Sequence, residues 1–234
     1  MSGLVTLKGL LRPARDRSAA VVRPMARPAL SMVRRHTRYS TPEYFLQQYR
    51  AGRFLYVNRW GGSQWIAPRQ RALVPIDERM HIPRSVARLV RRGDFDIRYD
   101  TAFAAVLRQC ASVHDRENAD DSWLTPDAQE VYLRLHELGF AHSTEAWRDG
   151  RLVGGEFGLG INGLYAADST FYLEPNAGKV AFAHLLDRLR SRGFLLYDTR
   201  VTSGATRPFG AYTVSRDDYQ VLLQEALSAD VAFH

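Results

Sequence analysis

The chain of 234 residues contains a single cysteine, Cys110, so no disulfide can form within it. It has neither a Cys-x-x-Cys pair nor a His-rich tract, the patterns that usually indicate a structural metal site. No stretch approaches the ~20 consecutive apolar residues that cross a bilayer. We therefore expect a soluble protein with no membrane contact. Cys110 ends an apolar helical pattern and is expected to be a buried small side chain.

Acidic residues are almost missing from the first 40 positions. Residues 1–40 hold nine Lys or Arg and one acid, Asp16, for a net charge of +8, whereas the remaining 194 residues carry 23 basic and 24 acidic groups. An Arg-rich, acid-poor tail is typical of an organelle transit peptide, of a basic arm that contacts nucleic-acid phosphates, or of an extension without a specific role. We expect residues 1–40 to be a disordered extension of a cytoplasmic protein, with organelle targeting left open.

Capping residues and turn signals divide the rest of the chain into helices and strands. Thr41 and Thr125 precede proline and predict helix starts, Ser215 caps a last helix, and Asp149-Gly150 predicts a type I′ hairpin turn. Helices are expected at about 42–51, 83–92, 101–111, 125–138, 176–191 and from 215 onward, strands at 95–99, 141–147, 151–158, 164–168, 194–201 and 211–214, and an exposed loop at 112–122. This order predicts an α+β fold with a mixed sheet whose faces are covered by helices, as in the acyltransferase fold of N-acetyltransferases.

Four polar residues interrupt the apolar strands of the second half of the chain. They are Glu156, Asp168, Asp198 and Arg200. A carboxylate or guanidinium in a buried strand costs several kcal/mol unless it is paired or used. These four side chains are therefore expected to line a functional site.

Six short strings, read together, carry a resemblance to a known family. They are His81-Ile-Pro-Arg-Ser85, Asp121-Ser-Trp-Leu-Thr125, Leu133-Arg-Leu-His-Glu-Leu-Gly139 with Ala141-His-Ser143, Leu152-Val-Gly-Gly155, Asp168-Ser-Thr-Phe171 and Asn176-Ala-Gly-Lys179. In combination they resemble leucyl/phenylalanyl-tRNA–protein transferases, colinearly from about Tyr44 to Leu227. The chain is thus similar to a divergent member of that family.

The resemblance implies both a fold and an activity. It implies a small N-terminal lobe at about 41–100 and a C-terminal lobe at 101–234 of the N-acetyltransferase (GNAT) type, which uses aminoacyl-tRNA in place of acetyl-CoA. Such proteins move an amino acid from its tRNA to the N-terminal amine of an acceptor protein that usually begins with Arg or Lys, and the product is marked for degradation. No cofactor and no metal are expected, and a monomer is favoured.

The resemblance also implies roles for particular residues. Arg84, Arg88, Arg91 and Arg92 would grip tRNA phosphates, although the four could equally form a solvated helix face. Trp65 and Trp123 would lie near the terminal adenosine of the tRNA, or else pack in the core. Asp168 would hold the α-amine of the aminoacyl group, with strand-end capping as the alternative.

Two positions depart from the family pattern. Arg200 follows Asp198 where the family has a glutamine proposed to accept a proton from the attacking amine, and a guanidinium cannot accept one. Arg200 would instead stabilise the oxyanion or pair with Asp198 or Asp168, leaving Asp198, a water or no group as the base. Glu156 replaces an apolar residue of the aminoacyl pocket, whose other members are expected to be Tyr165, Ser169, Leu185 and Tyr197. A carboxylate there favours a cationic donor over Leu or Phe, unless Glu156 pairs internally with Arg200.

Three functions remain open from the sequence. The first is aminoacyl transfer from tRNA with catalysis by Asp168, Asp198 and Arg200. The second is a tRNA- or degron-binding homologue that has lost catalysis, which the Arg200 replacement would favour. The third is an acetyl-CoA-dependent N-acetyltransferase, for which the segment Leu173–Lys179 lacks the second glycine of a pyrophosphate-binding turn.

Overall fold

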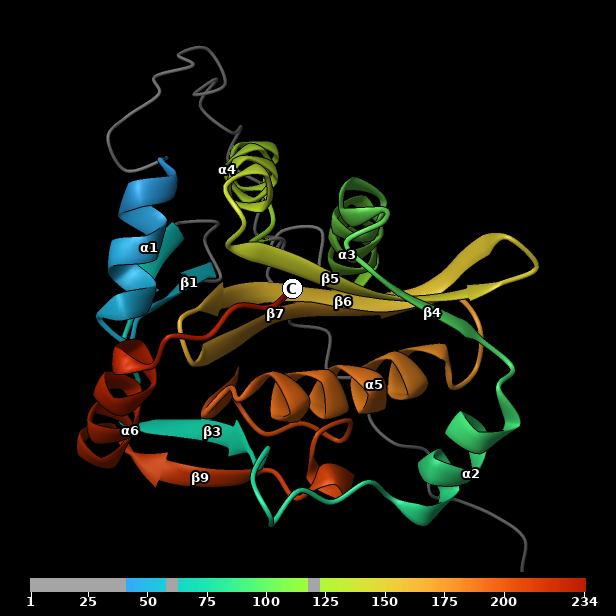
Figure 1. Cartoon of the computed structure of the whole chain (residues 1–234). Helices are drawn as coiled ribbons and strands as arrows, with labels where there is room; N and C mark the ends of the chain where they lie inside the picture. Colours follow the sequence, from blue (N-terminus) through green and yellow to red (C-terminus); the bar gives the residue numbers. More distant parts are fainter. Residues whose placement is uncertain (1–40, 58–62, 118–122) are drawn as a thin grey trace, which may run out of the picture. The chain divides into compact units, whose positions relative to one another are not determined.

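A seven-stranded mixed sheet is the centre of the computed structural model, which describes residues 41–57, 63–117 and 123–234 (Figure 1). The strand order is β4-β5-β6-β7-β8-β3-β9. The strands are β3 (Gln70–Val74), β4 (Asp96–Tyr99), β5 (Ala141–Arg148), β6 (Arg151–Ile161), β7 (Leu164–Tyr172), β8 (Leu196–Arg200) and β9 (Tyr212–Ser215). A separate hairpin joins β1 (Phe54–Val57) to β2 (Ser63–Ile66).

Helices cover both faces of this sheet. Helices α3 (Phe103–Glu117) and α4 (Pro126–Glu137) lie over one face, and α5 (Ala177–Arg192) crosses the other, with α2 (Arg84–Arg92) beside it (Figure 1). The remaining helices are α1 (Pro42–Arg50), which packs against α4, α6 (Arg216–Ser228), which packs against β9 and β3, and the short 3₁₀ helix η1 (Arg207–Phe209). The arrangement confirms the α+β class, whereas its N-acetyltransferase type stays a prediction.

The predicted caps and turns are found where the sequence places them. The side chains of Thr41, Thr125 and Ser215 each accept a hydrogen bond from a backbone N–H three residues later, at the starts of α1, α4 and α6. Asp149 and Gly150 have φ values of 51° and 72°, the left-handed conformation that a two-residue type I′ turn requires between β5 and β6. Local sequence therefore determines how these elements begin and reverse.

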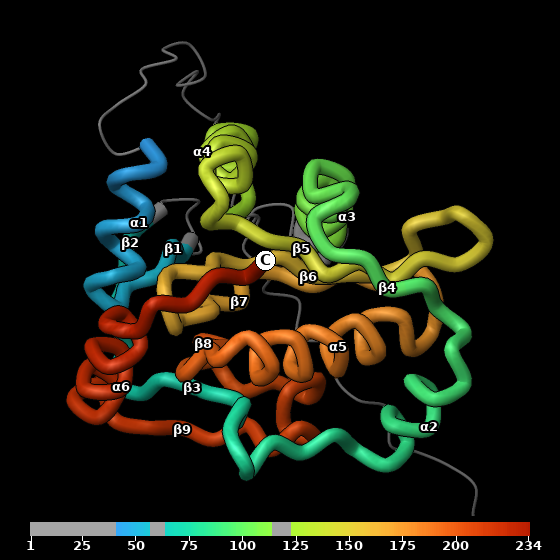
Figure 2. Tube along the Cα trace, in the orientation of Figure 1, coloured from blue at the N-terminus to red at the C-terminus, as the bar shows by residue number. Residues whose placement is uncertain are grey.

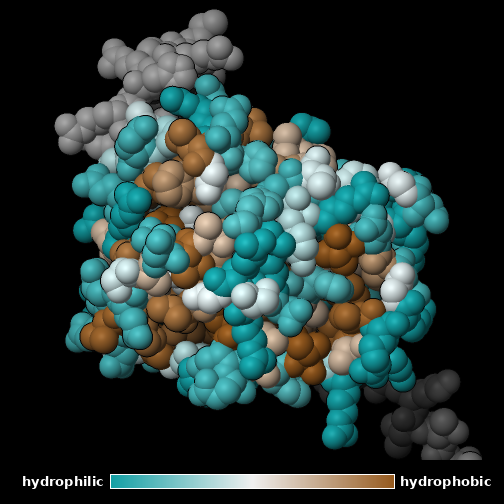
Figure 3. All heavy atoms as spheres, in the orientation of Figure 1, coloured by the Kyte–Doolittle hydropathy of each residue, from teal (hydrophilic) through white to brown (hydrophobic). Residues whose placement is uncertain are grey.

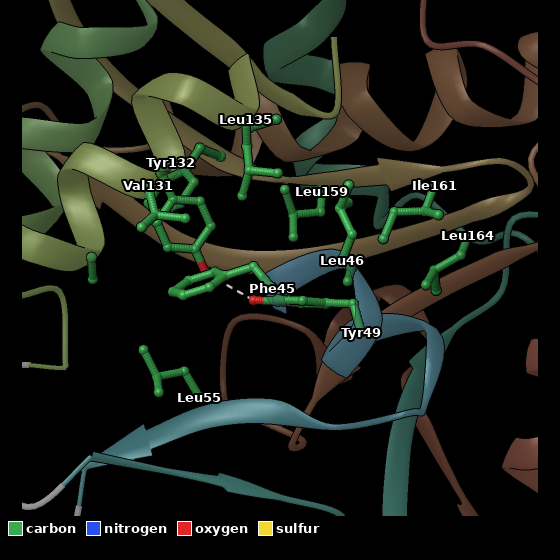
Figure 4. Close-up of a cluster of buried hydrophobic side chains, with 14 of the residues drawn as sticks. Phe45, Leu46, Tyr49, Leu55, Val131, Tyr132, Leu135, Leu159, Ile161 and Leu164 are labelled. Carbon is green, nitrogen blue, oxygen red and sulfur yellow. Dashed lines mark hydrogen bonds between the residues drawn. The ribbon is translucent and has the colours of Figure 1, made fainter. Parts of the chain in front are cut away.

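Two buried clusters lie on the two sides of the sheet. One includes Phe45, Tyr49, Tyr132 and Phe157 and joins α1 and α4 to the strands (Figure 4). The other gathers Tyr165, Leu185 and Tyr197 between the sheet and α5, together with other apolar side chains. On the face drawn in Figure 3, apolar side chains form separate patches among hydrophilic ones. The core is thus divided by the sheet, and so are the predicted site residues.

Several predicted boundaries need correction. Helix α3 continues to Glu117, so residues 112–117 are not the expected loop, and Cys110 is fully buried within that helix as predicted. β6 and β7 extend to Ile161 and Tyr172, beyond the predicted ends. Strands β3 and β4 precede residue 100 and yet belong to the same sheet as β5–β9 (Figure 2), while the division into lobes stays a prediction. Residues 1–40, with their predicted roles, lie outside the described residues.

No helix among the described residues is both long and apolar enough to cross a membrane.

Candidate functional site

The candidate site lies where β7 and β8 stop pairing. These are the one parallel pair among the described strands, and their register runs from Leu164–Leu196 to Ala166–Asp198. Each strand then has a β-bulge relative to its other neighbour, with no Cα partner for Asp168 in β6 or for Thr199 in β3. Bulges commonly occur beside active sites, where they redirect a side chain. Here they bring Asp168 of β7 and Arg200 of β8 together just beyond the last parallel pair.

Asp168 and Arg200 form a buried ion pair. Arg200 Nη2 contacts Asp168 Oδ1, and the two side chains are 11% and 0% exposed. The hydroxyl of Tyr49 donates to Asp168 Oδ1 at 2.6 Å and accepts from Arg200 Nη2 at 3.2 Å. The same hydroxyl lies 2.8 Å from that of Tyr132, as the dashed line in Figure 4 shows. Tyr49 of α1 thus bonds both members of the pair, and Tyr132 of α4 bonds Tyr49.

Two polar atoms of this ion pair have no hydrogen-bond partner among the residues that the structure describes. They are Asp168 Oδ2, an acceptor, and Arg200 Nε, a donor, and both are buried. An unsatisfied buried polar group costs about 1–3 kcal/mol, so native proteins rarely keep one without a use. One acceptor and one donor that lack partners are what an ammonium and a carbonyl oxygen of a ligand would need.

Asp198 belongs to a second buried ion pair, with Arg71 of β3. Arg71 Nε donates to Asp198 Oδ1 and Oδ2 at 2.9 and 2.8 Å, and its Nη2 donates to Oδ2 at 2.6 Å. Asp198 also accepts from the Tyr219 hydroxyl at 2.8 Å and from the backbone N–H of Arg200 at 2.8 Å. Burial alone would lower the pKa of Arg71, but the adjacent Asp198 carboxylate raises it above its usual value. Arg71 therefore remains charged.

The carboxylate of Asp198 holds Arg200 in an unusual backbone conformation. Arg200 has φ of +65°, a region that residues other than glycine seldom adopt. The hydrogen bond from its N–H to Asp198 Oδ1 stabilises that geometry and turns the guanidinium toward Asp168. Such strain often marks a functional position when the surroundings enforce it.

Trp123 lies against Arg200 of this ion pair, and Trp65 lies against Tyr49, which bonds to the pair. The Trp65 ring is 5.7 Å from the Tyr49 ring, and the Trp123 ring is 5.4 Å from Arg200 Cζ. Both indoles are half-buried, and each also packs on a core ring, at 4.9 Å between Trp65 and Phe45 and 6.0 Å between Trp123 and Tyr132. The structure thus brings both aromatic residues to the site, where they also serve the core.

Glu156 lies in a different environment from Arg200. It is 3% exposed, and its one described hydrogen bond is a long one, 3.4 Å, from the Tyr197 hydroxyl. Burial raises its pKa to about 8, and the Tyr197 bond lowers it only in part. Arg200 pairs with Asp168 instead, so the internal Glu156–Arg200 pairing considered from the sequence is wrong. Glu156 contacts Tyr197, which belongs to the cluster under α5. Arg200 contacts Tyr49, which belongs to the cluster under α1.

Of the other predicted pocket residues, Tyr197 contacts Glu156, Tyr165 and Leu185 share a cluster with Tyr197, and Ser169 has a different neighbour. The rings of Tyr165 and Tyr197 stack at 5.7 Å, and Leu185 of α5 belongs to the same buried cluster. Thr144, which pairs with Glu156 across β5 and β6, has a buried hydroxyl without a partner. Ser169 hydrogen-bonds Cys110 of α3, and burial raises the pKa of that thiol to about 12, which disfavours the thiolate form.

The arginine face of α2 is exposed and lies apart from the ion pairs. Arg84, Arg88, Arg91 and Arg92 are all exposed, and Arg92 contacts Asp94 at 2.5 Å. The helix packs against α5. Its side chains are thus available to a polyanion.

Sequence reasoning missed the residues that complete both ion pairs. Arg71 is a charged residue within the apolar strand Gln70–Val74. The same kind of signal identified Asp198, so Arg71 could have been found from the sequence. Tyr49 and Tyr132 gave no such signal, because tyrosine is common in helices that face a core.

Comparison with known proteins gives a consistent result. A family model described as leucyl/phenylalanyl-tRNA protein transferase matches residues 73–224. Proteins of the same name are 38% identical in Herpetosiphon aurantiacus, over 84% of this chain and 100% of the relative, and 41% identical in Nitratidesulfovibrio vulgaris, over 80% of this chain and 79% of the relative. A third, from Synechococcus, is 39% identical over 80% of this chain and 95% of its own length.

Among solved structures, one match is the C-terminal domain (DUF2156) of a putative lysylphosphatidylglycerol synthetase from Agrobacterium fabrum. It covers 80% of this chain and 57% of its own with 10% identity and a TM-score of 0.43, a likeness too weak to support an argument.

Proposed function

Because this chain belongs to the leucyl/phenylalanyl-tRNA protein transferase family, an aminoacyltransferase family, we propose that it transfers an amino acid from aminoacyl-tRNA to the N-terminal amine of an acceptor protein. The observation that carries the proposal is the Asp168–Arg200 ion pair with its two unpartnered atoms. The acceptor is proposed to begin with Arg or Lys, and the product to be marked for degradation.

The proposed reaction divides the work between the two side chains. Asp168 Oδ2 accepts a hydrogen bond from the α-ammonium of the donor aminoacyl group, as its lack of a partner permits. The acceptor amine attacks the ester carbonyl, a C–N bond forms, and the carbonyl oxygen becomes an oxyanion to which Arg200 Nε donates. The C–O bond to the terminal ribose then breaks, and the proton lost by the amine ends on the ribose oxygen.

Asp198 is assigned a positioning role in this scheme. Its oxygens already accept from Arg71, Tyr219 and the N–H of Arg200, which argues against proton transfer to it. An activated ester needs little help from a base when the amine and the ester are held together. We therefore assign proton removal to water.

The predicted tRNA contacts divide into two kinds. The exposed arginines of α2 supply phosphate contacts, and Trp65 and Trp123 supply aromatic surfaces beside the ion pair for the terminal adenosine. Each charge contact contributes salt-sensitive affinity without sequence preference.

Glu156 makes the donor amino acid the open part of the specificity. With a pKa of about 8, the carboxyl is mostly protonated at pH 7, so an apolar donor meets a neutral polar group and not a fixed charge. A basic side chain would ionise it and form a buried ion pair, with Tyr197 and Thr144 as further polar groups. We propose that Glu156 shifts donor preference from Leu and Phe toward Arg or Lys.

The test is a transfer assay with tRNAs charged with Leu, Phe, Met, Arg and Lys and a peptide that begins with Arg. Transfer from any of them supports the proposed reaction, and Arg or Lys as the best donor supports the Glu156 assignment. Leu and Phe as the best donors refute the assignment but leave the reaction standing.

One observation favours the second candidate, a homologue without catalysis that binds tRNA or degrons. Arg200 already occupies Asp168 Oδ1, as it would in a closed and inactive site. Retained tRNA binding with no transfer from any of the five donors would select this candidate. Stabilisation by acetyl-CoA in a thermal-shift assay would instead select the third, an acetyl-CoA-dependent acetyltransferase.

A further inference from the structure

Asp100, His142 and His234 form a cluster apart from the residues assigned above. Asp100 follows β4 and has φ of +58°, His142 lies in β5, and His234 is the last residue described. One ligand atom from each lies within 4.8 Å of the others. His142 belongs to a string that carries the family resemblance, yet the proposed reaction gives it no task.

The carboxylate of Asp100 lies between the two imidazoles. Its Oδ2 is 2.8 Å from His142 Nδ1 and also contacts His234 Nε2, and its Oδ1 accepts from the N–H of Ser143 at 2.6 Å. Burial would raise the pKa of Asp100, but these hydrogen bonds lower it below its usual value. The cluster therefore brings one carboxylate oxygen and two imidazole nitrogens within 4.8 Å of one another.

The surroundings hold two of the three ligands firmly and leave the third accessible. His142 is 5% exposed and stacks on Phe233 at 4.2 Å, and Phe233 is itself buried. Arg188 Nε donates to the carbonyl of Phe233 at 3.1 Å, which fixes the approach of His234. The side chain of His234 is 56% exposed, so an ion can enter from solvent.

We propose that Asp100, His142 and His234 bind a divalent transition metal ion of the Zn²⁺ class, with water as the fourth ligand. Two imidazoles and one carboxylate are a set that Zn²⁺ takes with metal–ligand distances of about 2.0–2.2 Å. The ion replaces the two Asp–His hydrogen bonds, and the proton on each ring moves to its other nitrogen. It ties His234 to β4 and β5 beside Tyr165, whose ring stacks on Phe233. The site is independent of the proposed reaction, and the water leaves one coordination position open.

Arg188 opposes metal binding in a defined way. Its Nη2 lies 3.1 Å from His234 Nδ1, where the guanidinium can only donate. A metal at Nε2 requires the proton on Nδ1, so this contact must break. Metal binding is therefore expected to release Arg188 Nη2 from His234 while Arg188 Nε keeps its bond to the carbonyl of Phe233.

The experiment is calorimetric titration of the EDTA-treated, dialysed full chain with ZnCl₂, for the native protein, His234→Ala and the control His81→Ala, which removes another exposed histidine. The native chain and the control are expected to share a Zn²⁺ site whose dissociation constant rises at least about tenfold in His234→Ala, since loss even of a partner outside the ligand shell weakens metal sites by about 10- to 100-fold. Visible absorption of bound Co²⁺ should disappear in the same variant.

Two results would overturn the proposal. The first is native chain that gives no heat beyond dilution. The second is a Zn²⁺ site that His234→Ala leaves unchanged or that His81→Ala abolishes as well. Because the side chain of His234 is 56% exposed, its removal is not expected to unfold the protein.

Discussion

Two buried Asp–Arg pairs meet at β8, and they differ in how many of their polar atoms have partners. Asp198 accepts from Arg71, Tyr219 and the N–H of Arg200, and Arg71 Nη1 also donates to the carbonyl of Gly52 at 3.2 Å. In the other pair, one oxygen of Asp168 and one nitrogen of Arg200 have no partner within the described part of the chain. The two pairs consist of the same residue types and are both buried. They differ in the number of polar atoms that have a hydrogen-bond partner.

The difference shows which pair supports the fold and which is open to a ligand. Breaking a fully bonded buried pair leaves an uncompensated charge, whereas a partly bonded pair already bears the cost of its unpartnered atoms. The Asp198–Arg71 pair stabilises the junction of β3, β8 and α6. The Asp168–Arg200 pair keeps a donor and an acceptor that a ligand can use. The following predictions test this contrast.

The largest expected effect is on stability, from Arg71→Met. The change leaves Asp198 charged and buried, so the free energy of unfolding should fall by about 3–5 kcal/mol. Urea unfolding measures it, with Arg190→Met, an exposed arginine of α5, as the control. A loss no greater than that of the control would remove the distinction between the two pairs.

The second effect is on activity, from Arg200→Met. Loss of the donor to the oxyanion should lower the transfer rate by about 10²–10³, as removal of one oxyanion donor does in other enzymes. Arg200→Met also leaves a buried carboxylate, Asp168, without its cation. Stability should still fall less than in Arg71→Met, because fewer hydrogen bonds are lost and the unpartnered Nε disappears with the side chain. Arg200→Gln, which keeps an N–H donor, should retain more activity than Arg200→Met in single-turnover transfer. Equal rates for the two variants would contradict the role given to Arg200.

Glu156 offers a third case, a buried carboxyl group that has no ion-pair partner among the described residues. Its pKa rises from 4.5 to about 8 on folding, so the folded protein binds this proton more tightly than the unfolded chain does. The contribution of Glu156 to the free energy of unfolding is therefore fully present below pH 4.5 and is lost as the pH rises toward 8. Between pH 6 and 8 the free energy of unfolding should fall by about 2 kcal/mol. Glu156→Gln, which cannot ionise, should lack that loss in urea unfolding at the two pH values. The same pH dependence in both proteins would show that another group causes it.

The smallest effect concerns the exposed arginines. Replacing Arg84, Arg88, Arg91 and Arg92 by Gln should weaken tRNA binding and make its dependence on salt shallower, by up to about one unit of slope per lost contact. The control removes four exposed arginines elsewhere, Arg50, Arg151, Arg192 and Arg207. Binding that responds equally to both variants would favour general charge attraction over a site on α2.

The sequence predicted most of the helices and strands and pointed to four polar residues of the candidate site, for reasons that can be named. Helix caps and the Asp149-Gly150 turn act locally, so they could be read directly. The position of β3 between β8 and β9 could not, because strand order depends on contacts between distant segments. Polar residues in apolar strands identified Asp168, Asp198, Glu156 and Arg200, but only the structure shows which of them pair.

The most direct test of the account is transfer by Asp168→Asn compared with the native chain. Asparagine keeps the size of the side chain and its bond with Tyr49 but loses the charge that would hold the donor ammonium. With the preferred donor on its tRNA and a peptide beginning with Arg, we predict transfer by the native chain and a loss of at least about 100-fold in the variant, with unchanged tRNA binding. Native transfer that Asp168→Asn leaves intact would contradict the assignment of this pair as the catalytic site.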